Sequence, residues 1–240
     1  MNIVADTHMH TLASGHAFNT ILEMVSAAKA KGLEMIAITE HAPAMQGSCG
    51  PIYFHNLQAT RYPFDGIEVL FGVELNIMDY EGTVDLDEKG LKRTDLRIAS
   101  MHVQCIKPGT EAENTRGILG AIQNPYVDII GHPDDSRFPM TYEPIIKAAA
   151  EYGKIIELNS NSFNPKNTRV NAWENDHVIL KLCEQYRVPI VISSDAHSVF
   201  ELAEFTKAKE LVEEMAFPEE LILNTSVEKL KGWLSVHHKV

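Results

Sequence analysis

Histidines and carboxylates stand at the ends of most short apolar runs in this sequence. Seven of its eleven histidines lie where such a run ends or one loop beyond. The segments are Asp6-Thr7-His8-Met9-His10 followed by His16, Thr39-Glu40-His41, Gly72-Val73-Glu74-Leu75-Asn76, Ser100-Met101-His102, Gly131-His132-Pro133 and Ser194-Asp195-Ala196-His197. Imidazoles and carboxylates bind transition metals, and gathered at one end of a parallel barrel they would form a metal site. The pattern therefore indicates metal-assisted hydrolysis.

The position of the pair His8-x-His10 at the end of a predicted strand makes it informative. Side chains two apart on a strand point the same way, about 7 Å apart at the backbone, which suits two imidazoles on one ion. A chain with eleven histidines contains one such pair by chance about half the time. Asp6 shares the face of both histidines, so we expect it to accept a hydrogen bond that fixes a ring tautomer; the alternative is a carboxylate that caps a turn. We interpret His237-His238 at the tail as surface residues.

Two carboxylates and three further histidines extend the set. Glu74 ends an apolar run, where a charge is costly unless it is coordinated or paired, and its two oxygens can bridge two ions. A buried salt bridge is the alternative for Glu74, and a helix N-cap is the alternative for Asp195. His197 follows Asp195 at the same two-residue spacing, and His102 and His132 end two further runs. Agreement between separate strand ends favours the metal site over these individual alternatives.

The apolar runs alternate with amphipathic segments. Strands are predicted at 3–6, 35–39, 68–75, 96–101, 127–131, 155–158 and 189–193, and helices at 20–31, 111–123, 142–152, 175–186, 199–214 and 227–234. Short β-branched runs alternating with helices predict parallel βα units. Polar residues at the ends of all seven strands favour a closed barrel, because an open sheet would confine the site to one crevice. We therefore predict an α/β fold, a distorted (βα)7 TIM-like barrel in a single domain, 1–240.

The net charge, the apolar runs and the cysteine content restrict the class of protein. The net charge of −12 disfavours a surface for long nucleic acids or anionic membranes. No apolar run is long enough to span a bilayer, and the amino terminus has no basic segment or cleavage site typical of a signal peptide. Three widely spaced cysteines, Cys49, Cys105 and Cys183, are expected to be free thiols in a reducing cytoplasm.

In order and combination, the strand-end motifs resemble those of the polymerase and histidinol phosphatase (PHP) superfamily, and most closely its YcdX-type bacterial phosphatases. The resemblance extends over nearly the whole chain and implies a barrel that holds three divalent metal ions. It assigns the first ion to His8, His10, Glu74 and Asp195, the second to Glu74, His102 and His132, and the third to His16, His41 and His197. One departure is Glu40, where many relatives have aspartate, and this leaves the outer contacts of His41 open.

The expected reaction is attack by a metal-activated hydroxide on a phosphate monoester of a small molecule. Arg169 is predicted to join Glu74 and Asp195 in the catalytic set, because it follows the sixth strand and its guanidinium can bind two phosphate oxygens. Arg137, five residues beyond His132, is a second candidate for this role. An exposed loop arginine is the alternative for both.

Other functions compete with this one. The same ions could cleave diesters, as in a phosphodiesterase or exonuclease that acts on short nucleic acids. Two-metal amidohydrolases also begin with His-x-His, but they typically place a lysine where this chain has His102. A metal-binding barrel without turnover is the third alternative. The histidine-rich ligand set favours Zn²⁺, while Mn²⁺ and Fe²⁺ also suit mixed nitrogen and oxygen ligands. The natural substrate and the oligomeric state, including a homo-oligomer, stay open.

Overall fold

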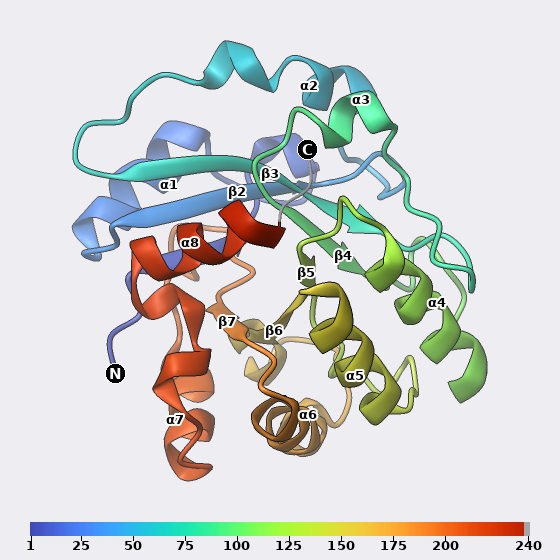
Figure 1. Ribbon diagram of the computed structural model, residues 1–240. Coiled ribbons are helices and arrows are strands. Elements are labelled where there is room, and N and C mark those ends of the chain that lie inside the picture. The colour runs from blue at the N-terminus through green and yellow to red at the C-terminus, as the bar shows by residue number, and fades with distance from the viewer. Residues whose placement is uncertain (238–240) are drawn as a thin grey trace.

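The computed structural model describes residues 1–237 and contains seven parallel strands (Figure 1). They are β1 Ala5–Met9, β2 Met35–His41, β3 Glu68–Asn76, β4 Arg97–Ser100, β5 Ile129–Ile130, β6 Ile155–Asn159 and β7 Ile190–Ser193. Each strand pairs in parallel with the next one along the chain. The predicted α/β fold is therefore confirmed as a nearly closed (βα)7 TIM-like barrel.

Asn224 joins the first and last strands. Its buried side chain donates to Ala5 O and Ile192 O, both at 2.7 Å, and accepts from Ile192 N at 3.1 Å. Nearer the carboxyl ends of the strands, His10 N donates to Ala196 O at 2.9 Å. A side chain and a single bridge thus take the place of a continuous ladder, which explains the distortion of the barrel.

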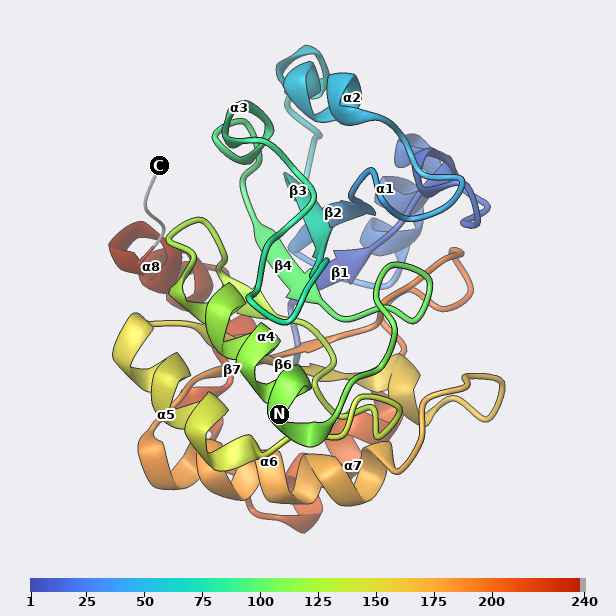
Figure 2. The same ribbon diagram turned by 90° about the vertical axis from the view of Figure 1, so that its right-hand side faces the viewer.

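Helices follow the strands and surround the barrel. They are α1 Ile21–Ala30, α2 Pro51–His55, α3 Glu88–Leu91, α4 Glu111–Gln123, α5 Tyr142–Tyr152, α6 Ala172–Tyr186, α7 Thr206–Glu214 and α8 Val227–His237. The helices α4, α5 and α6 lie side by side along one flank (Figures 1 and 2). Capping boxes at Thr20 and Thr110 start α1 and α4, because each threonine and the glutamate three residues later satisfy each other's backbone N–H.

The predicted helix at 199–214 is wrong in its first half. Ala203 has a φ of +57°, and its N–H donates to Asp6 Oδ2 at 3.0 Å. A left-handed residue interrupts a right-handed helix, so α7 begins only at Thr206.

The surface interpretation of the tail is also corrected for His237, which ends α8 half-buried with its ring stacked on Trp233 at 4.1 Å. The other tail residue, His238, lies outside the described residues.

The last helix covers the amino ends of the strands. Leu230 and Leu234 of α8 pack against Ala5, Met35 and Ile155, each of which begins a strand. A larger apolar core lies between the barrel and the surrounding helices. With the amino end covered, the carboxyl ends of the strands are the face on which a site can open.

Cys49, Cys105 and Cys183 are free thiols, as predicted. Among the described helices, none combines the length and the apolar character needed to cross a membrane.

Candidate metal centre

The polar residues at the strand ends converge on the carboxyl face of the barrel. The structure brings together all nine side chains predicted as ligands: His8, His10, His16, His41, Glu74, His102, His132, Asp195 and His197. Most of them are buried, while His16 is exposed at the rim. Residues that are far apart in sequence thus form one cluster of imidazoles and carboxylates.

Four of these side chains form a compact group at the base of the cluster. His8 Nε2 and His10 Nε2 lie 3.1 Å apart. His8 Nε2 lies 3.4 Å from Glu74 Oε2, and His10 Nε2 lies 3.4 Å from Asp195 Oδ1. Tetrahedral zinc with bonds of about 2.0–2.1 Å places its ligand atoms about 3.3 Å apart. The separations in this group therefore fit ligands of one ion.

Glu74 lies at the centre of the cluster and uses both carboxylate oxygens. Its Oε1 lies 3.2 Å from His102 Nε2 and 3.0 Å from His132 Nε2, and its Oε2 lies 2.7 Å from His41 Nδ1. Despite this short distance, Glu74 Oε2 and His41 Nδ1 form no hydrogen bond with any residue in 1–237, and both atoms are buried. Burying such atoms without a partner is costly, and a bound cation would satisfy both. The donor set therefore fits a metal site to which Glu74 offers both of its carboxylate oxygens.

His41 connects two parts of the cluster. The ligand atoms of His10, His41 and His197 all lie within 4.8 Å of one another, and so do those of His41, Glu74 and His102. At the rim, His16 Nε2 lies 3.0 Å from His197 Nε2. The family resemblance assigns His41 to the third ion alone, whereas its geometry places it within reach of the second position as well.

A buried glutamate that the sequence analysis did not assign orients two of the histidines. Glu157 Oε1 lies 2.6 Å from His8 Nδ1, and Glu157 Oε2 accepts from His132 N at 2.7 Å. With its Nδ1–H donated to Glu157, His8 presents a free Nε2 to the cluster. A signal was present in the sequence, because Glu157 interrupts the apolar run of β6 just as Glu74 ends the run of β3.

Polar contacts outside the cluster also orient other histidines. Asn76 Oδ1 lies 2.8 Å from His102 Nδ1. Ser14 Oγ lies 3.1 Å from His10 Nδ1 and donates to Glu40 Oε2 at 2.5 Å. Glu40, whose role the sequence left open, therefore acts through Ser14 on His10. These contacts leave each ring with its Nε2 available to a metal ion.

Asp6 does not contact a histidine side chain in the way that we expected. Its Oδ1 accepts from Ser194 N at 3.0 Å, and its Oδ2 accepts from Ser194 Oγ at 2.5 Å and from Ala203 N at 3.0 Å. The side chain therefore holds the loop after β7 against β1, which is the turn-capping alternative. Burial raises the pKa of the Asp6 carboxyl to about 6, although the hydrogen bonds from Ser194 oppose this shift.

Charge is distributed unevenly among the clustered side chains. Burial disfavours a proton on His8, but the carboxylates of Glu157, Glu74 and Asp195 outweigh this effect and raise its pKa well above the ordinary value. Burial and neighbouring imidazoles lower the pKa of His10 well below the ordinary value. A neutral imidazole is the form that binds metal, so His10 is already in its ligand state at neutral pH.

Two of the candidate ligands have unusual backbone conformations. The φ angles of His132 and Asp195 are +29° and +47°, in the left-handed region that few residues other than glycine adopt. Close approach of β4 and β5 precedes His132, since a Cβ atom on Gly131 would lie 2.2 Å from Ser100 Oγ. Backbone strain of this kind persists where surrounding contacts fix the chain, and it often accompanies functional sites.

The two candidate arginines have different surroundings. Arg169 is almost fully buried; it donates from Nη2 to Asp195 Oδ2 at 2.8 Å and from Nη1 to Ser162 Oγ at 2.9 Å. Arg137 is more exposed, and its Nε donates to Asp135 Oδ2 at 2.7 Å. Both line a cavity of about 220 Å³ above the cluster, together with candidate ligands that include Asp195. This metal cavity has the size and the positive groups required by a small anion.

Comparison with known proteins now identifies the family. The sequence profile of the PHP domain matches residues 6–217, which includes every candidate ligand. The chain belongs to the PHP domain family. It is 46% identical over 239 residues to a "Probable phosphatase" of Caldicellulosiruptor saccharolyticus, covering 100% of this chain and 99% of that protein. A further "Probable phosphatase", from Caldanaerobacter subterraneus subsp. tengcongensis, is 45% identical over 240 residues and is covered over 94% of its length.

Solved structures of PHP proteins have the same fold. Histidinol phosphate phosphatase from Lactococcus lactis subsp. lactis, complexed with zinc, L-histidinol and phosphate, superposes with a TM-score of 0.63 at 21% identity. The match covers 89% of this chain and 94% of that one. A putative histidinol phosphatase from Listeria monocytogenes gives a TM-score of 0.62 at 17% identity, over 85% and 99% of the two chains. These likenesses support the barrel architecture.

Proposed function

We propose that this PHP protein hydrolyses phosphate monoesters of small molecules at a centre of three divalent metal ions. The observation that carries the proposal is that two buried atoms, Glu74 Oε2 and His41 Nδ1, form no hydrogen bond within residues 1–237 although they lie inside a cluster of nine potential ligands. Metal ions bound there would activate water and offset the charge of the phosphate group. The relatives named "Probable phosphatase" support this class of reaction.

The residues of the chain have distinct roles in this proposal. Glu74 and Asp195 hold the ions and are the carboxylates at the reacting centre, while Glu157 fixes the ring of His8. Arg169 already contacts Asp195, and its guanidinium has further N–H groups that can bind a phosphate oxygen. Zn²⁺ is the ion that we propose first, because the ligand set is rich in histidine and the Lactococcus lactis phosphatase was solved with zinc. Mn²⁺ and Fe²⁺ are the alternatives.

The shape and charge of the site favour a small monoester over a polymer. The metal cavity is about 220 Å³. A net charge of −12 repels long nucleic acids, whereas the cations proposed for the centre would reverse the sign of the potential inside the cavity. The substrate is therefore proposed to be a small phosphorylated molecule.

The test compares metal-free and metal-loaded protein on p-nitrophenyl phosphate, bis(p-nitrophenyl) phosphate and an N-acyl substrate. We expect turnover of the monoester only, dependent on metal, and loss of both turnover and bound metal in Glu74→Gln. Activity on the diester alone would favour a phosphodiesterase, and amide cleavage would favour an amidohydrolase. Full metal occupancy with no turnover on any substrate would indicate a metal-binding barrel without catalysis. A fully active Glu74→Gln variant would refute the bridging role of Glu74.

A further inference from the structure

The side chain of Asn76 lies between the ring of a candidate ligand and a carboxylate. Asn76 ends β3 and is fully buried. Its Oδ1 lies 2.8 Å from His102 Nδ1. On the other side, its Nδ2 donates to Asp85 Oδ2 at 2.7 Å and to Ala42 O at 3.3 Å. An amide thus connects the ring of His102 with a carboxylate that does not belong to the metal cluster.

The carboxylate of Asp85 determines which way this amide faces. A half-turn of the side chain would exchange the oxygen and the nitrogen of Asn76. After such a turn, Asn76 Oδ1 would face two acceptors, Asp85 Oδ2 and Ala42 O, and the NH2 group would face His102. Acceptors that face each other repel, most strongly where one of them carries a negative charge. The observed orientation is therefore the one in which His102 meets an oxygen.

The orientation of Asn76 decides which nitrogen of His102 can bind a metal ion. With an oxygen opposite it, Nδ1 carries the proton and donates, which leaves the lone pair on Nε2. His102 Nε2 lies 3.2 Å from Glu74 Oε1, inside the metal cluster. If an NH2 group faced Nδ1 instead, the proton would move to Nε2, the atom that is available to the cluster.

Asp85 is itself held in place by backbone groups of two segments. Its Oδ1 accepts from Asn76 N at 2.8 Å, and its Oδ2 accepts from Ala44 N at 2.7 Å. An antiparallel bridge between Ile77 and Val84 brings the chain back to the end of β3 just before Asp85. Within residues 1–237, no cationic side chain pairs with Asp85, so its charge acts on the N–H groups of Asn76 and Ala44.

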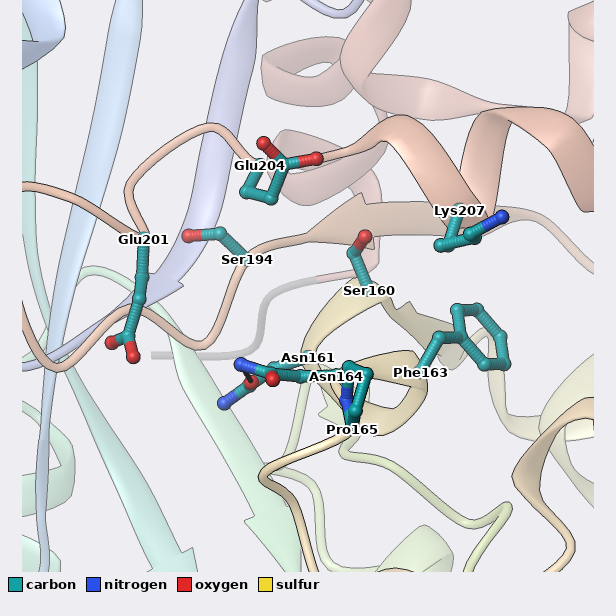
Figure 3. Close-up of a pocket in the computed structure, with 9 residues that line it drawn as sticks. All are labelled: Ser160, Asn161, Phe163, Asn164, Pro165, Ser194, Glu201, Glu204 and Lys207. Atoms are coloured by element: carbon teal, nitrogen blue, oxygen red, sulfur yellow. Dashed lines mark hydrogen bonds between the residues drawn. The ribbon is translucent and has the colours of Figure 1, made fainter.

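Side chains that follow β6 and β7 contact the candidate ligands differently. Figure 3 shows two of them, Asn161 and Glu201. Asn161 Nδ2 donates to Asp195 O at 3.4 Å, and Glu201 Oε2 accepts from His197 N at 2.9 Å. Both therefore contact the backbone of a candidate ligand, and in the described part of the chain neither forms a hydrogen bond with a ring nitrogen. Asn76 differs because it meets the ring itself.

We propose that Asp85 is a positioning residue for the second metal position, because it acts through Asn76 to keep the proton of His102 on Nδ1. The inference rests on the proposed metal centre and adds to it a residue that contacts none of the candidate ligands. Asp85 has the role that Glu157 has behind His8, with an amide inserted between the carboxylate and the ring.

The test locates the ring proton directly in the metal-free full-length protein. At alkaline pH, a long-range ¹H–¹⁵N spectrum separates a ring nitrogen that carries a proton from one that does not, and the His102 signals are those absent from His102→Gln. We expect a bare Nε2 in the wild type. In Asp85→Ala the amide is free to turn, so a second form with a bare Nδ1 should appear. Competition with a chromophoric chelator should then show that one metal ion binds about 10- to 100-fold more weakly.

Two further variants separate the orientation of the ring from the stability of the turn. Asp79 holds the same turn, because its Oδ1 accepts from Glu81 N at 2.9 Å and from Thr83 N at 3.0 Å. We therefore expect Asp79→Ala to lower the thermal midpoint without changing the spectrum or the affinity. In Asp85→Ala/Asn76→Asp, a carboxylate faces the ring and either of its oxygens can accept the proton, so the bare Nε2 and the affinity should return. Should Asp85→Ala fail to fold, Asp85→Ser takes its place with the same expected spectrum, since a hydroxyl can still accept from a backbone N–H.

The remaining outcomes decide against the inference. A wild-type spectrum and wild-type affinity in Asp85→Ala would overturn it while leaving the phosphatase function intact. The same holds if Asp79→Ala reproduces both changes, or if the folded double variant keeps the second form. A wild-type protein that binds no metal would instead refute the proposed function, and this inference with it.

Discussion

Replacing Glu157 with glutamine should weaken metal binding, although Glu157 is not a ligand. Four donors converge on its carboxylate: His8 Nδ1 and Ser193 Oγ reach Oε1, while His132 N and Asn159 Nδ2 reach Oε2. Glutamine keeps the shape of the side chain but offers only one oxygen, and its amide group is itself a donor. Whichever way the glutamine amide is oriented, two of the four donors therefore face its NH2 group instead of an oxygen.

Each of the two orientations of the amide has its own cost. If the amide faces His132, the backbone N–H of that residue cannot rotate away, and one buried donor is left unsatisfied at about 1–3 kcal/mol. If it faces His8, the ring can accept a hydrogen bond only by moving its proton from Nδ1 to Nε2, the atom turned toward Glu74. The first cost lowers stability, and the second removes a metal-binding atom.

We expect a dissociation constant for metal about 10- to 100-fold higher in Glu157→Gln, as is usual for groups that orient metal ligands. The metal-free variant should also unfold a few degrees lower, since about 1 kcal/mol shifts the midpoint of a chain of this size by about 2–4 °C. Competition with a chromophoric chelator gives the affinity, and calorimetry gives the midpoint. Glu151→Gln, which changes an exposed glutamate on α5, is the matched control. Wild-type affinity and midpoint in Glu157→Gln would refute this reasoning.

Further predictions concern side chains around the centre. Arg169→Ala removes the guanidinium next to Asp195, so kcat/KM for a phosphate monoester should fall about 10- to 100-fold, and an unchanged value would exclude Arg169 from phosphate binding. Burial and the charge of Asp134 raise the pKa of Asp176 well above its ordinary value. The folded state therefore holds this proton more tightly than the unfolded chain does, and stability is lost as pH rises from about 4 through the folded pKa. The thermal midpoint of Asp176→Asn, measured between about pH 5 and pH 9, should therefore not show this loss of stability. A midpoint that falls with pH as steeply in the variant as in the wild type would contradict the prediction. Burial raises the pKa of Cys49 to about 11, compared with an ordinary value of 9.0. Alkylation of Cys49 at pH 8, measured by peptide mass spectrometry, should therefore be about a hundredfold slower than alkylation of an exposed cysteine. Equal rates would show that the thiol is not shielded.

The sequence predicts the carboxyl face of the barrel well because parallel strands bring their ends together. Once His8, Glu74 and Asp195 are placed at strand ends, the βα pattern requires them to lie on one face. The closure of the barrel is different, since it depends on Asn224 bonding to Ala5, 219 residues away. No local pattern contains that contact.

The orientation of the histidines was harder to predict than their presence. Sequence spacing predicts Asp6 as the acceptor because it is two residues from His8 on the same strand face. The structure uses Glu157, 149 residues away from His8, because β6 directs this side chain into the barrel while Asp6 is occupied by Ser194. Sequence spacing finds ligands that share a strand, but it does not find the partners that fix their tautomers across the barrel.

The atoms that support the proposed metal centre would also couple metal binding to folding. Glu74 Oε2 and His41 Nδ1 are buried and form no hydrogen bond among the described residues, and burial with neighbouring imidazoles lowers the pKa of His16 to about 4. The folded chain thus disfavours a proton on His16 and leaves Glu74 Oε2 and His41 Nδ1 without hydrogen bonds, and the second condition has a cost that the unfolded chain does not bear. An ion that binds the folded state removes this cost, so it stabilises the barrel by an amount that grows with its free concentration. The proposed centre would therefore oppose folding when it is empty and favour folding when it is filled, which would link the stability of the barrel to the availability of metal.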